Sequence, residues 1–390
     1  MSRVTGRGSG TVAGGRVGLL LDPNLLASLG AGKRVALVSG TNGKTTTTAL
    51  LAAAAGANGT LVATNHTGSN MPAGHVAALV GQSETEIAVL EVDEAYVAQV
   101  ALATKPAVIV LLNLSRDQLD RMSEVRMVAE RWRGSLAALP VTTVVANADD
   151  PLIVYAARDA SHVVWVAGGL RWREDATGCP ACGGHISFDA QGGWTCADCD
   201  LARPAVAWRL VDDLIEGPDG AVPIALSLPG RFNVENAVLA VAAAAALNVT
   251  AVQSAAAMSL VTDVAGRFVQ RTIGEVRVRL MLAKNPAGWS ALLDLVVDEE
   301  APVVVSINAR TADGADPSWL YDVDFGLLAG RPVVATGDRW RDLSVRLRYA
   351  EVAHRCESDP GDAVALAGAD GQRVEFIGNY TAFRDLLERP

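Results

Sequence analysis

The sequence predicts an α/β fold, with a parallel-sheet domain followed by a smaller α/β domain. Short apolar runs alternate with helical patterns over residues 33–170, which is typical of a doubly wound, largely parallel sheet. The first run, residues 34–38, passes through a glycine turn into an alanine-rich stretch of high helix propensity. The alternation resumes after residue 263, so we expect a second, smaller domain there.

Composition and charge exclude several classes of protein. A chain of 390 residues, of which 50% are apolar, can form two or three domains. It has no apolar run of about 18 residues free of charge or glycine, so we expect no membrane span. The net charge of −10 argues against general nucleic-acid binding. Residues 1–18 contain no apolar signal core, so we expect residues 1–32 to be a lead-in, mobile at its start, to a cytoplasmic protein.

The glycine turn at residues 39–48 has the form of a phosphate-binding loop. Glycines let backbone N–H groups approach phosphate oxygens, and the N-terminus of the following helix adds a positive field. We expect Lys44 to reach the β- and γ-phosphates of ATP and the Thr45 hydroxyl to ligate Mg²⁺. The general motif has glycine where this chain has Val38, and the alternative is an ordinary glycine turn before a helix. The residues expected to bind ATP here are Gly40, Thr41, Asn42, Gly43, Lys44, Thr45 and Thr46.

A polar stretch follows the next predicted strand, residues 60–64. The carboxyl end of such a strand is where α/β sheets place ligand loops. Asn65 and Asn70 are therefore candidates to contact phosphate, metal-bound water or substrate. A solvated turn is the alternative.

The predicted strand at residues 86–94 ends in three carboxylates. Acidic oxygens at a strand end beside a phosphate loop suit Mg²⁺, which prefers oxygen ligands. Strand alternation would send Glu91 and Asp93 to one face and Glu94 to the other. We expect Glu91 to ligate magnesium and keep Glu94 as second choice.

Four of the five cysteines form two close pairs with thirteen residues between them. Two Cys-x-x-Cys turns predict a closed, structural zinc site, because a redox dithiol needs only one pair. The expected zinc ligands are Cys179, Cys182, Cys196 and Cys199. Residues 183–195 contain no lysine or arginine, which argues against a ribbon that binds nucleic acid. We expect the zinc ribbon to occupy about residues 172–205.

Several motifs resemble those of the Mur ligases and folylpolyglutamate synthetases. The loop Gly-Thr-Asn-Gly-Lys-Thr-Thr is similar to their ATP loop, and Asn113 begins a segment similar to their Asn-Leu-x-x-Asp-x-Leu-Asp pattern, with Asp117 and Asp120 in it. These enzymes use ATP to convert a carboxylate to an acyl phosphate, which an amine then attacks. The resemblance implies that Asn236, in a Gly-x-x-Asn-x-x-Asn segment, reads the adenine edge. It also implies that Arg267, in a Gly-Arg hinge, meets the nucleotide phosphates on domain closure.

Two C-terminal segments resemble the MurT family in particular. They are Leu-Ala-Lys-Asn-Pro-Ala-Gly at residues 282–288 and the aspartate-rich stretch at residues 308–325. MurT proteins are the synthetase subunit of lipid II isoglutaminyl synthase. The resemblance implies ATP-dependent amidation of the α-carboxyl of D-glutamate in the lipid II stem peptide, with Lys284 beside the transferring phosphoryl group.

The same resemblance implies a partner and a place in the cell. Ammonia would come from a GatD-type glutamine amidotransferase that forms a heterodimer with this chain, and lipid II would be met at the inner face of the plasma membrane. Asp322 is the expected residue that this chain lends to the partner's Cys-His pair, with Asp324 as the alternate. The remaining cysteine, Cys356, lies outside any nucleophile-elbow pattern.

The expected organisation is therefore a lead-in at residues 1–32, a Mur ligase-type ATP-binding domain at 33–263 and a MurT-type domain at 264–390. About 35 residues precede the phosphate loop, so the nucleotide-sugar domain of ordinary Mur ligases is not expected. Two alternatives remain. One is an amino-acid-adding Mur or folylpolyglutamate-type ligase, and the other is an ATPase whose zinc ribbon binds nucleic acid.

Overall fold

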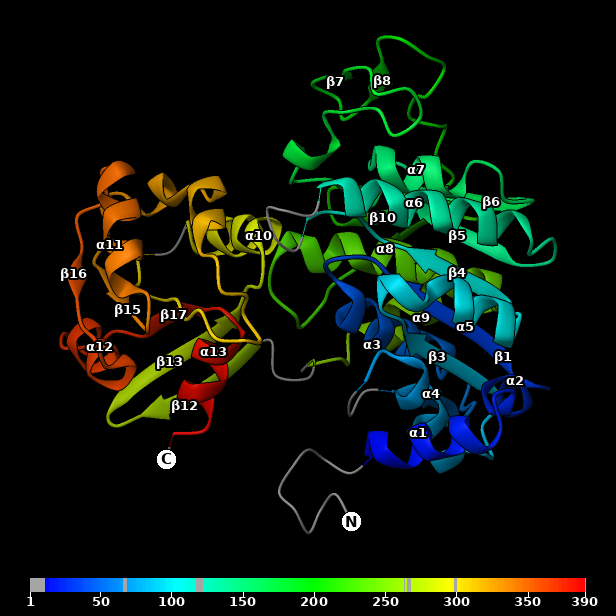
Figure 1. Cartoon of the computed structure of the whole chain (residues 1–390), viewed down its shortest axis with the longest axis horizontal. Helices are drawn as coiled ribbons and strands as arrows, with labels where there is room; N and C mark the ends of the chain where they lie inside the picture. The colour runs from blue at the N-terminus through cyan, green and yellow to red at the C-terminus, as the bar shows by residue number, and fades with distance from the viewer. Residues whose placement is uncertain are drawn as a thin grey trace. The chain divides into compact units, whose positions relative to one another are not determined.

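The computed structural model describes residues 11–65, 69–116, 122–262, 264, 268–297 and 300–389. Contacts divide the chain into two compact units (Figure 1). The first comprises residues 1–115 and 122–262, and the second comprises 116–121 and 263–390.

The first unit is built on a six-stranded sheet of order β2-β3-β1-β4-β5-β6 (Figure 1). Every strand pair in it is parallel, which confirms the predicted parallel sheet. The strands are β1 (Arg34–Ser39), β2 (Val62–Thr64), β3 (Ile87–Glu91), β4 (Val108–Leu111), β5 (Thr143–Asn147) and β6 (His162–Val166). Since every connection between parallel strands must cross over the sheet, the carboxyl ends of all six strands lie at one edge.

Two groups of helices cover this sheet. One group packs together as α3 (Lys44–Ala55), α8 (Arg231–Ala246) and α9 (Ala251–Met258). The other includes α4 (Pro72–Gly81), η1 (Glu94–Tyr96), α5 (Val97–Thr104), α6 (Met122–Ala137) and α7 (Pro151–Ala157). The central part of α8 is buried and consists mainly of alanine and valine. These small side chains let the helix approach both the sheet and α3 closely.

Residues 11–30 differ from the expected mobile lead-in. They form α1 (Thr11–Leu21) and α2 (Leu25–Gly30), and both helices contact α4. Gly15 shows how close this packing is, because a Cβ there would lie 1.9 Å from the carbonyl oxygen of Ala73. Glycine here permits a tight helix–helix contact.

The cysteine region forms a small lobe of the first unit (Figure 1). It contains η3 (Glu174–Ala176) and the antiparallel pair β7 (Ile186–Phe188) and β8 (Trp194–Cys196). A three-stranded antiparallel sheet follows, with β9 (Arg209–Val211), β10 (Leu214–Gly217) and β11 (Gly220–Pro223). The sequence analysis missed this second sheet because its short strands are exposed and carry little apolar pattern.

The second unit contains a six-stranded sheet of order β12-β13-β17-β14-β15-β16. Only β12 is antiparallel to its neighbour. Its strands are β12 (Phe268–Ile273), β13 (Val276–Leu282), β14 (Val303–Ser306), β15 (Val333–Thr336), β16 (Arg355–Cys356) and β17 (Val374–Gly378). Its helices are α10 (Pro286–Val296), η4 (Ser318–Asp322), η5 (Phe325–Leu328), α11 (Trp340–Tyr349), α12 (Pro360–Ala367) and α13 (Tyr380–Leu387).

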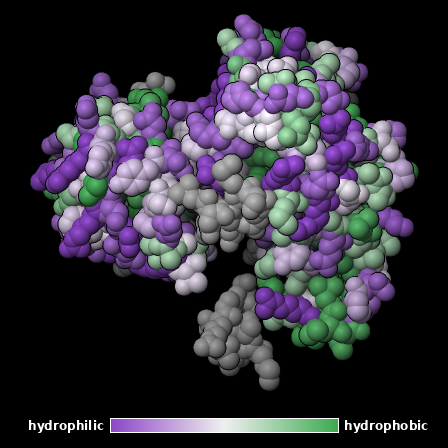
Figure 2. Space-filling view, turned by 45° about the horizontal axis from the view of Figure 1, so that its top comes forward, coloured by the Kyte–Doolittle hydropathy of each residue, from purple (hydrophilic) through white to green (hydrophobic). Residues whose placement is uncertain are grey.

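The molecular surface is largely polar, as Figure 2 shows on the face that it displays. No helix in the described part of the chain is both long and apolar enough to cross a bilayer.

Candidate active site

The glycine loop after β1 is shaped by its two glycines. Gly43 is the N-cap of α3 and has a positive φ of 85°. A Cβ at Gly43 would lie 2.8 Å from Oδ1 of Asn236 on α8, so a larger residue would clash with that amide. Gly40, with φ at 145°, is equally confined, because a Cβ there would lie 2.8 Å from Cβ of Leu112. The loop and Asn236 are thus in direct contact.

Asn113, which follows β4, holds the loop in place. Its carbonyl oxygen accepts from the Thr41 N–H at 2.9 Å, and its Oδ1 accepts from the Asn42 N–H at 2.9 Å. Its Nδ2 donates to the Asn42 carbonyl at 3.1 Å. The backbone donors of Thr41 and Asn42 therefore position the loop. The N–H groups at the start of α3, which have no intrahelical acceptor, are the ones that suit a phosphate.

Lys44 is buried and lies over the loop. Its Nζ donates to the Gly40 carbonyl at 2.5 Å and the Thr41 carbonyl at 3.1 Å. It also forms an ion pair with Glu94 at 3.1 Å. Glu94 was the second choice for magnesium, and in this structure its carboxylate instead balances Lys44. A phosphate group arriving at the loop would compete with Glu94 for the same cation.

The strand that carries Glu91 ends sooner than predicted. β3 stops at Glu91, and the Asp93 carboxylate caps η1 by accepting from the Ala95 N–H at 3.1 Å. Asp93 keeps an extended backbone, with φ at −65° and ψ at 144°, but it lies beyond the end of the strand.

Two side chains hold the main chain of Glu91. Asn65 Nδ2 donates to the Glu91 carbonyl, and Asn65 Oδ1 accepts from the Glu91 N–H, at 2.9 Å each. His75 on α4 contacts the Glu91 carbonyl through Nε2 at 2.8 Å. Burial lowers the pKa of His75, which favours the neutral ring and Nε2–H donation. The sequence analysis missed His75, since a histidine within an apolar helix shows no pattern.

Asp150, at the N-cap of α7, is fully buried. Its Oδ2 accepts from the Leu114 N–H and its Oδ1 from the Leu152 N–H, both at 2.8 Å. Burial raises the pKa of Asp150 to about 6, against the opposing effect of these N–H donors. This carboxyl group fastens the segment after β4 to the start of α7, so it supports the loop that Asn113 holds.

Asn233 lies inside α8 and does not cap it. The N-cap is Gly230, and Asn233 Nδ2 donates to the Pro229 carbonyl at 2.7 Å. Arg267, expected to meet the nucleotide on closure, lies outside the described residues, as do Asp117 and Asp120.

The four ribbon cysteines gather at one point. Their sulfur atoms all lie within 4.8 Å of one another, and the Cys179–Cys199 and Cys182–Cys196 distances are 3.6 and 3.5 Å. Tetrahedral zinc with Zn–S bonds of about 2.3 Å separates its sulfurs by about 3.8 Å, so the cluster fits such an ion. The distances are too long for disulfides. The Asp198 N–H lowers the pKa of the Cys196 thiol to about 7, whereas burial and the neighbouring thiols raise the pKa of Cys199 to about 12.

In the second unit, Lys284 is the second residue after β13, with its Nζ 5.4 Å from the centre of the Tyr380 ring. The next residue, Asn285, is buried and caps α10 by accepting from the Gly288 N–H at 2.9 Å. The Asn-Pro pair of this segment is therefore a helix start.

Three of the four aspartates between residues 313 and 324 accept hydrogen bonds from backbone N–H groups. Asp313 accepts from the Thr381 N–H at 2.9 Å, Asp316 from the Ser318 N–H at 2.9 Å and Asp324 from the Gly326 N–H at 3.1 Å. Asp322 differs, because its Oδ2 is buried without a hydrogen-bond partner among the described residues.

Comparison with protein families agrees with this geometry. The family described as the Mur ligase middle domain matches residues 38–244, more than half of the chain. The chain belongs to the Mur ligase family. A second family, described as MurT ligase C-terminal, matches residues 282–383.

Curated relatives place the chain near one branch of the Mur ligase family. It is 28% identical to the lipid II isoglutaminyl synthase (glutamine-hydrolyzing) subunit MurT of Streptococcus pneumoniae, over 97% of this chain and 93% of that protein. It is also 28% identical to the MurT subunit of Staphylococcus aureus strain COL, over 100% of this chain and 94% of that protein.

Solved structures confirm the Mur ligase-like fold. A pseudomurein peptide ligase type C from Methanothermus fervidus aligns with a TM-score of 0.68 at 19% identity, covering 91% of this chain and 78% of that one. Mycobacterium tuberculosis folylpolyglutamate synthase aligns with a TM-score of 0.63 at 18% identity, covering 96% and 94%.

Within the Mur ligase unit, the structure brings together the glycine loop, Lys44, Glu94, Asn113 and Asn236. Glu91 lies at the end of the neighbouring strand, opposite Val38 of β1. Lys284, Asp322 and Asp324 belong to the other unit.

Proposed function

We propose that this protein is the synthetase subunit of a lipid II isoglutaminyl synthase. In this reaction the α-carboxyl of D-glutamate in the stem peptide of lipid II becomes the amide of D-isoglutamine. The observation that carries the proposal is the full-length similarity to two MurT subunits, together with the MurT C-terminal match at residues 282–383.

ATP with Mg²⁺ would convert the carboxylate to an acyl phosphate, which ammonia attacks. The first turn of α3 supplies the N–H donors for the phosphates, and Lys44 supplies the cation once Glu94 releases it. Thr45 opens α3 beside Lys44, and its hydroxyl with the Glu91 carboxylate offers the oxygen ligands that Mg²⁺ prefers. We assign the reading of the adenine to Asn236, which is in contact with Gly43.

We assign the four ribbon cysteines to a structural zinc ion. A closed set of four thiolates leaves no open position for a substrate, so the metal would organise the ribbon and take no part in the amidation.

Asp322 is the better candidate to act in a partner's glutaminase site. Arg346 donates to the carbonyls of Leu320 and Val323 at 3.0 and 2.6 Å, which fixes the backbone around Asp322, while Asp322 Oδ2 has no hydrogen-bond partner among the described residues. Asp324 is already engaged as the cap of η5. A carboxylate that orients the histidine of a Cys-His pair needs such a free, rigidly held oxygen. The partner would be a GatD-type amidotransferase in a heterodimer.

This assignment predicts a selective defect for Asp322→Asn. In the complex with the amidotransferase, amidation from glutamine should fall at least about 100-fold, while amidation from ammonium should stay unchanged. Asp324→Asn is the matched control and should leave both activities near wild type. Equal loss of both activities in Asp322→Asn would contradict the proposed role.

The substrate is lipid-linked, so the enzyme would act at the cytoplasmic face of the plasma membrane. The alternative, an amino-acid-adding ligase, is disfavoured because Leu-Ala-Lys stands before Asn285-Pro286 where such ligases have Asp-Tyr-Ala-His.

The deciding experiment follows the acceptor by mass spectrometry. Purified protein is incubated with ATP, Mg²⁺ and a lipid-linked muropeptide, and receives either ammonium or a mixture of amino acids. Conversion of a carboxyl to an amide with ammonium alone supports the proposal, and a reaction without ATP is the control. A product that has gained an amino acid would show a peptide ligase instead.

A further inference from the structure

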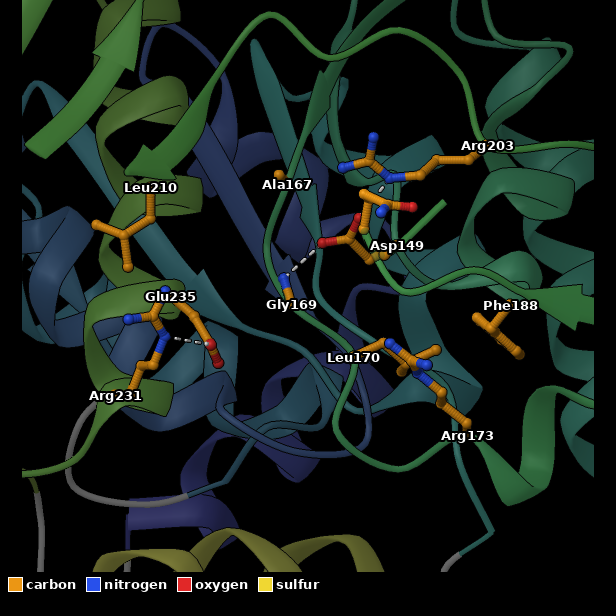
Figure 3. A pocket seen from close by; sticks show the side chains of 12 residues that line it. Asp149, Ala167, Gly169, Leu170, Arg173, Phe188, Arg203, Leu210, Arg231 and Glu235 are labelled. Carbon is orange, nitrogen blue, oxygen red and sulfur yellow. Dashed lines mark hydrogen bonds and ion pairs between the residues drawn. The ribbon is translucent and has the colours of Figure 1, made fainter. Parts of the chain in front are cut away.

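The first unit contains a pocket of about 220 Å³ that the ATP loop does not form. Besides Asp149, which follows β5, three parts of the chain line it: the segment after β6 up to Arg173, the cysteine ribbon with β9, and the start of α8. Figure 3 shows the side chains of these parts directed toward a common space. Ala167, Leu170 and Leu210 give it an apolar part.

Arginine from each of the three parts lines this pocket: Arg173, Arg203 and Arg231. Two carboxylates also line it, and both already have partners. Asp149 accepts from Arg203 at 2.7 Å and from the Gly169 N–H at 2.8 Å (Figure 3). Glu235 lies 3.4 Å from Arg231 and 3.6 Å from Arg171. The charges of the pocket therefore sum to a positive excess.

Arg173 carries that excess. Its guanidinium lies 4.8 Å from the centre of the Phe188 ring, a cation–π contact that orients it without neutralising it. No carboxylate lies within ion-pair distance of Arg173 in the described ranges of the chain. Because arginine stays protonated at every physiological pH, this exposed cation is permanently available to an anion.

The pocket lies at the edge of the sheet that also carries the ATP loop. Asp149 follows β5 and Gly169 follows β6, while the loop follows β1, and all three strands are parallel. Helix α8 joins the two places, because Asn236 meets Gly43 whereas its neighbour Glu235 lines the pocket. Ligands of open α/β sheets bind at this carboxyl edge, so one extended molecule can reach both.

We propose that this pocket is an anion-binding subsite for the acceptor substrate, in which Arg173 and Arg231 hold a carboxylate or phosphate group remote from the carboxyl that is amidated. This rests on the proposed function. Stem peptides and lipid diphosphates both carry such groups, and the ribbon contributes to the reaction by building one wall of the subsite.

The test compares Arg173→Gln, Arg173→Lys and Arg131→Gln, whose arginine is exposed on α6 away from this pocket. Because Arg173 is exposed, its substitution leaves the core intact. Steady-state amidation gives separate KM values for ATP and acceptor, and calorimetry gives acceptor binding without turnover. Three acceptors are used: a disaccharide pentapeptide with its diphosphate, the same without the diphosphate, and the latter with its remote carboxylates converted to amides.

Loss of a charge-assisted hydrogen bond should weaken acceptor binding about tenfold in Arg173→Gln, with KM for ATP and kcat unchanged. The acceptor affinity of Arg173→Lys should lie between those of wild type and Arg173→Gln, and the affinity of Arg131→Gln should match wild type. If removing one group from the acceptor abolishes the difference in binding between wild type and Arg173→Gln, that group is the anion that Arg173 holds.

Normal amidation and binding by Arg173→Gln would overturn the subsite while leaving the proposed function standing. Acceptor binding that depends on Arg173 without any amidation would support the subsite and overturn the proposed function. Absence of both in the wild type would overturn both.

Discussion

The ATP loop and the cysteine ribbon are both short motifs of the first unit, but different interactions hold them. Asn113, Glu94 and Asn236, which come from three distant segments, fix the loop. The ribbon brings its four sulfurs together within the span from Cys179 to Cys199. The loop therefore depends on contacts from across the whole unit, whereas the ribbon gathers its cysteines within its own turns and is joined to the unit through Trp194 and Arg203.

Removing one Cys-x-x-Cys turn of the ribbon should have the largest effect of the substitutions that distinguish the two motifs. Cys179→Ser with Cys182→Ser deletes two of four thiolates, and structural zinc contributes on the order of 10 kcal/mol in small sites. We expect bound zinc to fall from one equivalent to none by atomic absorption, and protease cleavage to appear within residues 172–205.

Nucleotide affinity of this double variant should stay within about threefold of wild type, because no ribbon residue contacts the loop in the described structure. The exposed Cys356→Ser is the matched control and should retain zinc. A loss of nucleotide binding equal to the loss of zinc would show that the two motifs are not independent.

Lys44→Met breaks the loop itself. ATP-dependent turnover should fall on the order of 1000-fold, about 4 kcal/mol, because the cation facing the transferring phosphoryl group is lost. The substitution also removes the cation that pairs with the Glu94 carboxylate, so the melting temperature should fall as well.

Adding Glu94→Gln to Lys44→Met separates these two effects. The double variant should recover thermal stability, since the carboxylate that faced the Lys44 cation is gone, but not turnover. Recovery of turnover would disprove the catalytic role of Lys44.

Asp150 is the buried carboxyl group that fastens the segment after β4, and its titration can be tested through the pH dependence of stability. Burial raises the pKa of Asp150 to about 6, so between about pH 4 and pH 6 the folded chain binds a proton that the unfolded chain has released. The contribution of Asp150 to the free energy of unfolding should therefore be largest below pH 4 and fall by roughly 3 kcal/mol as the pH rises to 6. Urea denaturation across this range should show this contribution as a difference in slope between wild type and Asp150→Asn.

Asp150→Asn should lack this component of the slope, because an amide does not titrate there. The same slope in both proteins would contradict the assignment to Asp150. Asp159→Asn, which alters a half-exposed surface ion pair, is the control and should keep the wild-type slope.

Asn113→Ala is the smallest change to the loop. It removes the acceptor of the Asn42 N–H and the donor to the Asn42 carbonyl, which costs about 1–3 kcal/mol. We expect KM for ATP to rise about tenfold. Ser115→Ala removes only a 3.4 Å contact to Asn42 and should change KM less than twofold. Equal effects of the two substitutions would contradict the proposed clamp.

Much of this protein could be predicted from local pattern. Strand, glycine turn and helix around Lys44 are coded by neighbouring residues, and so is the pairing of cysteines in the ribbon. The family resemblance also depends on short motifs, and the comparisons confirm it. These features involve side chains that act near their place in the chain, so their order alone predicts them.

Other features arose only from tertiary contacts. The pairing of Lys44 with Glu94, the support of Glu91 by His75, and the arginine pocket all join residues from separate elements. Helix α1 was missed for a related reason, since its glycine at position 15 is explained only by the close contact with α4. The sequence by itself determined the kind of chemistry, because reactive residue types and turns are local. Only the folded structure decided which charges are balanced and which are left for a ligand, because that depends on distances across the sheet.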